Sequence, residues 1–144
     1  MTTVDLSSFK GLYVKTSRDY LNKLKQDLER LLKDPTDQNS INSIHISAHS
    51  LSTQAAVTGY KNAERLSGII EKTFKKLKEE KLKASPGLLT LLNDAVRSLS
   101  ECIDSIENND EETDLSDVSN KLEKLWPFDK LRVMVSEVEL WKYL

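Results

Sequence analysis

The 144-residue sequence predicts an all-α protein: an antiparallel up-down four-helix bundle, a fifth helix and a C-terminal extension. Apolar residues recur every three or four positions over long stretches, which is the spacing of one face of an α-helix. The breaks between these stretches are short, so consecutive helices are expected to lie antiparallel and to bury their apolar faces against one another. No strand pattern competes before residue 130.

Two apolar stripes define the first two predicted helices. The first stripe, with Thr16 in its widest gap, is Phe9, Leu12, Tyr13, Tyr20, Leu24, Leu28 and Leu31. This helix is expected to end at Asp34, because Pro35 disfavours helix in the residue before it. The second helix is expected to run to Gly59, and its stripe is Ile41, Ile44, Ala48, Leu51 and Ala55.

Three further helices are predicted after Gly59. The third stripe is Ala63, Leu66, Ile70, Thr73 and Leu77. Ser85 and Pro86 predict the N-cap and first position of the fourth helix, whose stripe is Leu88, Leu92, Ala95, Leu99, Cys102 and Ile106. Residues 107–117 carry six acids and no base, which predicts a solvated loop. The fifth and shorter helix follows with Leu115, Val118, Leu122 and Leu125.

The helical bundle is expected to occupy residues 1–125. Residues 126–144 form a C-terminal extension that is expected either to pack on the bundle or to serve as a linker or interaction tail. Its apolar spacing favours a helix, although its β-branched residues also suit a strand.

Composition excludes several classes of function. The chain has a net charge of -2, which does not favour binding to nucleic acid, and it has no apolar run long enough to span a membrane. The N-terminus lacks the pattern of a secretory signal, so a cytoplasmic location is expected. One Cys and two His give no internal disulfide and no tetrahedral zinc set of the usual kind. With no phosphate loop or catalytic triad either, the sequence predicts no cofactor and no enzyme activity of its own.

His49 is the candidate functional residue. It lies about 100° round the second helix from Ala48, on a separate stripe with His45, Ser52 and Thr53. His49 is therefore expected at the edge of the core, open to solvent among small and polar side chains. A surface histidine on a bundle is more often a solvated residue than a functional one, so the spacing needs a second observation.

Glu71 supplies that observation. His49 lies ten residues before Gly59 and Glu71 lies twelve after it, so both are expected at nearly the same level of adjacent antiparallel helices. Gly68, one turn before Glu71, leaves room beside it. A carboxylate that accepts a hydrogen bond from one imidazole nitrogen fixes the tautomer and makes the other nitrogen more nucleophilic. This pair would suit a histidine that accepts a phosphoryl group.

The motif around His49 strengthens this interpretation. Residues 48–60, Ala-His-Ser-Leu-Ser-Thr-Gln-Ala-Ala-Val-Thr-Gly-Tyr, resemble the signature of histidine-containing phosphotransfer (HPt) domains. Residues 6–125 resemble in particular the N-terminal phosphotransfer domains of the CheA-type chemotaxis kinases. The resemblance implies that His49 is the phosphoacceptor, that Glu71 orients it, and that the partners are a histidine kinase catalytic domain and a response regulator receiver domain.

Two residues depart from the family pattern. Ser52 and Thr53 stand where the family has Lys and Gly, so an ammonium that offsets phosphoryl charge is missing. Slower phosphorylation is therefore expected. His45, one turn before His49, could contact a phosphoryl group or could replace an apolar residue as a half-buried packing group. The alternative function is a bundle that binds its partners without being phosphorylated.

Overall fold

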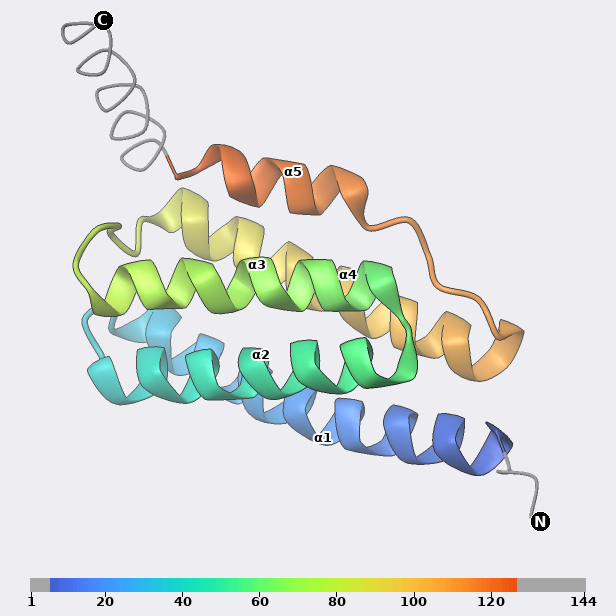
Figure 1. The fold of residues 1–144 in the computed structure, drawn as a ribbon. Helices are drawn as coiled ribbons and strands as arrows, with labels where there is room; N and C mark the ends of the chain where they lie inside the picture. Colours follow the sequence, from blue (N-terminus) through green and yellow to red (C-terminus); the bar gives the residue numbers. More distant parts are fainter. Residues whose placement is uncertain (1–5, 127–144) are drawn as a thin grey trace, which may run out of the picture.

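The computed structural model describes residues 6–126, with side chains from Phe9 onward, and contains five α-helices and no strand in that range. The helices are α1 (Leu6–Lys33), α2 (Gln38–Thr58), α3 (Lys61–Lys78), α4 (Pro86–Asn109) and α5 (Ser116–Lys124). The predicted all-α class, the order of the helices and their antiparallel course are confirmed (Figure 1). The predicted helix in the C-terminal extension lies outside the described residues.

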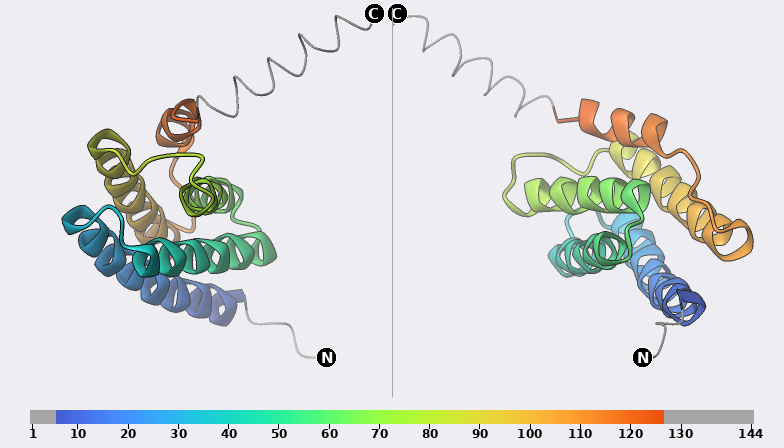
Figure 2. Two further views of the ribbon diagram at one scale, coloured as in Figure 1. Left: turned by 90° about the vertical axis from the view of Figure 1, so that its left-hand side faces the viewer. Right: turned by 45° about the vertical axis from the view of Figure 1, so that its right-hand side comes forward.

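The first four helices form a ring. Helix α2 packs against α1 and α3, and α4 closes the ring through its contacts with α1. Helices α3 and α4 touch each other much less, and α5 lies against both of them. Figures 1 and 2 show α5 on the side of the bundle away from α1 and α2. The α2–α3 pair is therefore left with a face that α5 does not cover.

The core consists of the predicted stripes of α2, α3 and α4. Every residue of those three stripes is buried, including Thr73, whose hydroxyl donates to the Ile69 carbonyl oxygen at 2.7 Å. Leu115 and Leu122 of the fifth predicted stripe are also buried, while Val118 and Leu125 pack partly buried against the core. The apolar periodicity of these helices therefore identifies the inward faces correctly.

The prediction for α1 is wrong at its N-terminal end. Phe9 is 53% exposed and Leu12 is 63% exposed, whereas Val14, Ser17 and Leu21 are buried in their place. The buried face of this part of α1 includes Ser17. Because Ser17 is polar, apolar spacing alone does not identify this face as the inward one. Phe9 and Leu12 instead lie on the surface beside α2.

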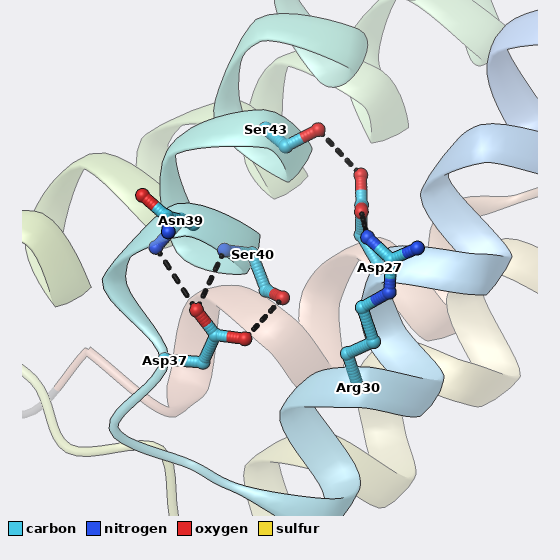
Figure 3. A network of polar contacts seen from close by, with 6 residues as sticks. All are labelled: Asp27, Arg30, Asp37, Asn39, Ser40 and Ser43. Carbon is cyan, nitrogen blue, oxygen red and sulfur yellow. Dashed lines mark hydrogen bonds and ion pairs between the residues drawn. The ribbon is translucent and has the colours of Figure 1, made fainter.

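Cap residues fix both ends of α2 and the start of α4. Asp37 accepts hydrogen bonds from the backbone N–H groups of Asn39 and Ser40 at the start of α2 (Figure 3). Gly59 ends α2 with φ of 86°, a left-handed conformation that favours glycine. Ser85 accepts from the N–H of Leu88 at the start of α4, as the sequence predicts. The turn at Gly59 sets where α3 begins and hence the register of α2 against α3.

The acidic segment is largely exposed, as predicted, but its first residues are not a loop. Its first residues belong to α4, which runs to Asn109. Glu112 accepts hydrogen bonds from the N–H groups of Ala63, at 2.9 Å, and Asn62, at 3.3 Å. These are unpaired donors at the first turn of α3, where the helix dipole also favours a carboxylate. The segment thus ties α4 to the start of α3.

Trp126 is the last described residue, and its ring packs partly buried against the core. Its indole Nε1 donates to Thr73 Oγ1 at 3.2 Å, and the Lys76 ammonium lies 5.0 Å from the ring centroid. These contacts anchor the first residue of the predicted extension on α3. The boundary at residue 125 stays a prediction.

Candidate functional site

His49 and Glu71 meet on the exposed side of the α2–α3 pair. The His49 side chain is 65% exposed, and its Nδ1 lies 2.7 Å from Glu71 Oε2. A carboxylate can only accept, so this contact assigns the proton to Nδ1. In the neutral ring Nε2 then carries a free lone pair. The site presents a nucleophilic nitrogen whose tautomer is set by a fixed partner.

Three cross-helix contacts define the register of α2 and α3. Besides His49 with Glu71, Lys78 Nζ donates to Asn42 Oδ1 at 2.9 Å. At the third level, a Cβ placed on Gly68 would lie 3.5 Å from Ser52 Oγ. From His49 and Glu71, seven residues back along α2 and seven forward along α3 lead to Asn42 and Lys78. Three residues forward along α2 and three back along α3 lead to Ser52 and Gly68. We call this line of paired levels the α2–α3 seam.

His45 lies in the seam between the levels of Asn42 and His49. It is half-buried one turn before His49, and both alternatives for its role stay predictions. Burial lowers the pKa of His45 from its ordinary value of 6.5, and the Lys78 ammonium lowers it further, while Glu71 opposes the shift.

Ser52 and Thr53 are both held within the helix pair. Ser52 Oγ donates to the carbonyl oxygen of Glu64 at 3.3 Å, and Thr53 Oγ1 donates to the carbonyl oxygen of His49 at 2.9 Å. Gly68 faces Ser52 rather than the imidazole. These residues surround His49 on its C-terminal side and bring no charge to it.

The basic residues of α3 differ in the partners that their side chains contact. Arg65 lies 2.9 Å from Asn120 Oδ1 and 2.9 Å from Glu123 Oε1, both beyond α3 on the α5 side. Lys78 lies in the seam with Asn42. Sequence analysis did not single out the seam lysines as site residues. The signal that could have found them is the same four- and seven-residue spacing that relates Lys75 and Lys78 to Glu71.

An apolar groove lies on the other side of α2, against α1. Its volume is about 440 Å³, and it is lined by Phe9, Leu12, Tyr13, Thr16, Thr53, Gln54, Val57 and Thr58. Val57 is 83% exposed. Thr53 belongs both to the groove and to the turn of α2 that follows His49. Sequence analysis missed this groove because it assigned Phe9 and Leu12 to the core.

The described residues contain neither a candidate metal-binding cluster nor a membrane-spanning helix. No group of three or more His, Cys, Asp or Glu residues among them is placed to hold a metal ion. None of the described helices is long and apolar enough to cross a membrane.

Comparison with known proteins identifies relatives that match most of this chain. Chemotaxis protein CheA of Bacillus subtilis (strain 168) is 26% identical over 121 residues, which are 83% of this chain and 18% of that protein. The chain thus spans less than a fifth of this curated relative. The solved CheA phosphotransferase domain from Thermotoga maritima has the same fold, with a TM-score of 0.67 and 24% identity, over 72% of this chain and 98% of that domain. The family described as Hpt domain matches residues 8–109, and the chain belongs to this family.

Proposed function

We propose that this Hpt domain carries a phosphoryl group on Nε2 of His49. It takes the group from ATP bound to a histidine kinase catalytic domain and passes it to an aspartate of a response regulator receiver domain. The observation that carries the proposal is the 2.7 Å contact between Nδ1 and Glu71 on a side chain that is 65% exposed. Family membership and the likeness to CheA domains support the same role.

In the proposed transfer, this chain contributes the imidazole and the carboxylate that orients it. The Nε2 lone pair attacks the terminal phosphorus of ATP, an N–P bond forms, and the bond to the ADP oxygen breaks with its electrons on ADP. The ring then gains positive charge, which the Glu71 carboxylate offsets through Nδ1–H. In the second step an aspartate oxygen attacks the phosphorus, and the N–P electrons return to Nε2. The chain thus acts as a carrier, while the kinase supplies ATP.

The apolar groove supports a docking role for the face beside His49. A partner that brings a reacting atom to Nε2 must cover the surface around it, and the groove begins one turn away at Thr53. Exposed apolar surface of this kind marks contact sites. We infer that the receiver domain covers the groove. Val57→Asp should slow phosphoryl transfer from the labelled domain to the regulator, while hydrolysis of the phosphohistidine stays unchanged.

Chemical phosphorylation tests the proposal without any partner. The chain is incubated with potassium phosphoramidate, and acid-labile phosphate is followed by intact mass and phosphorus NMR. Labelling is expected on the wild-type chain and not on His49→Gln, whose helicity should be intact because the replaced ring opens no core cavity. Equal labelling of both proteins would place the reaction elsewhere and contradict the proposal.

The alternative is a binding module that is never phosphorylated. Ser52 and Thr53 favour it, because their side chains bond within the helix pair and leave the C-terminal side of His49 without a cation. A wild-type chain that resists phosphoramidate and kinase alike, yet still binds the receiver domain, would support this second function.

A further inference from the structure

Phosphorylation of His49 would bring two negative groups close together. A phosphoryl group brings a charge of about -2. The two nitrogens of an imidazole are separated by one carbon, so a phosphoryl group on Nε2 stays close to the Glu71 carboxylate that holds Nδ1. The phosphoryl group and the Glu71 carboxylate are both negative, so they repel each other. A cation near Nε2 would remove the conflict, and residue 52, where the family has Lys, is Ser in this chain.

The α2–α3 seam provides a cation on the opposite side of His49. Lys75 follows Glu71 by four residues, just as His45 precedes His49 by four. The contacts above and below, His49 with Glu71 and Asn42 with Lys78, therefore place Lys75 at the level of His45. One helical turn, a rise of about 6 Å, separates Lys75 from the level of the phosphoryl site.

Lys75 is also the seam cation that is most available. It is exposed, and no ion pair of its ammonium is found among residues 6–126. Arg65 is held by Glu123 on α5, and Lys78 is held by Asn42 at the far end of the seam. The four-carbon stem of a lysine lets its ammonium turn toward a new anion.

We propose that Lys75 is the charge partner of the phosphoryl group on His49, with His45 beside it as a second polar contact. This inference rests on the proposed function. The stabilising cation has moved from α2, on the C-terminal side of the histidine, to α3 on its N-terminal side. Charge-assisted hydrogen bonds of this kind are about twice as strong as neutral ones.

The test compares lysine variants under phosphoramidate. Lys75→Gln should slow labelling of His49 about tenfold, the loss expected for one charge-assisted contact. It should also speed hydrolysis of the phosphohistidine. Lys75→Arg, which keeps the charge, should stay within about twofold of wild type. Lys61→Gln is the matched control, since Lys61 is an exposed lysine of the same helix ten residues before Glu71.

A double variant sharpens the result. Adding Ser52→Lys to Lys75→Gln should restore labelling, because it returns an ammonium to the turn after His49. Equal labelling rates for Lys75→Gln and wild type, or an equal loss of rate in Lys61→Gln, would overturn the role of Lys75. Either result would leave the proposed phosphorylation of His49 standing. If the wild-type chain takes up no phosphate on His49, the proposed function fails and this inference fails with it.

Discussion

Helix α2 contacts a carboxylate on each side, and the two contacts differ in their exposure. On the α1 side, Ser43 Oγ donates to Asp27 Oδ2 at 2.5 Å, and the Asp27 side chain is only 5% exposed (Figure 3). On the α3 side, His49 meets Glu71 at 2.7 Å, and the exposed fractions are 24% for the Glu71 side chain and 65% for the imidazole side chain. Burial therefore separates two similar hydrogen bonds into a structural contact and an accessible site.

The physical reason is competition with water. Asp27 is a buried carboxylate that bonds to Ser43 and, at 3.4 Å, to the Arg30 guanidinium. Because a buried polar group is costly to leave without its hydrogen bonds, the Asp27 contact is expected to stabilise the packing of α1 on α2. Around His49 water can replace either partner, so the Glu71 contact contributes little to folding and mainly fixes the ring. The following substitutions test this division.

The largest effect is expected at the exposed contact. Glu71→Ala should slow phosphorylation of His49 about 10 to 100-fold, because removal of the partner of a functional histidine typically costs this much. The unfolding free energy should change little. Phosphoramidate labelling rates and nitrogen NMR of the ring measure both the loss and the mixed tautomers that would cause it. A wild-type rate in Glu71→Ala would show that the ring orients without this carboxylate.

The buried contact is expected to show the opposite pattern. Asp27→Ala should lower the free energy of unfolding by about 1 to 3 kcal/mol, since it leaves the half-buried Ser43 hydroxyl unpaired. His49 should still be labelled at the wild-type rate once the protein is folded. Urea unfolding followed by circular dichroism gives the stability. Asp104→Ala, which removes an exposed partner of Arg18, is the control and should cost less than about 1 kcal/mol.

The smallest effect concerns pH and His45, the half-buried neighbour of the exposed contact. The pKa of His45 is lowered in the folded chain. As the pH falls below about 6.5, the unfolded chain therefore takes up a proton on His45 more readily than the folded chain does. Stability should therefore fall as the pH drops through this range. His45→Gln should lose less stability between about pH 7 and pH 5 than wild type. Identical pH profiles would mean that His45 titrates alike in both states.

Sequence reasoning anticipated the site better than its surroundings. The level of Glu71 with His49 followed from counting residues on either side of Gly59, because helical rise is constant and the turn is short. Periodicity failed at α1, where the buried line passes through Ser17 and the apolar Phe9 and Leu12 face outward. A pattern of apolar spacing cannot choose between two adjacent stripes when a polar residue belongs to the core.

Two other contacts across the bundle escaped prediction. Glu112 at the start of α3 and Asp27 beside Ser43 are acids whose positions suit solvent when only neighbouring residues are considered. Their partners lie 49 and 16 residues away in the chain. Only the assembled bundle brings a donor to each.

The turn at Gly59 also affects how the protein folds. His49 and Glu71 are 22 residues apart, whereas Arg65 and Glu123 are 58 apart and Lys10 and Asp110 are 100 apart. Closing a short loop costs less chain entropy than closing a long one, and local contacts favour fast folding. The histidine and its carboxylate therefore belong to a single helical hairpin, which can assemble before the ends of the chain meet.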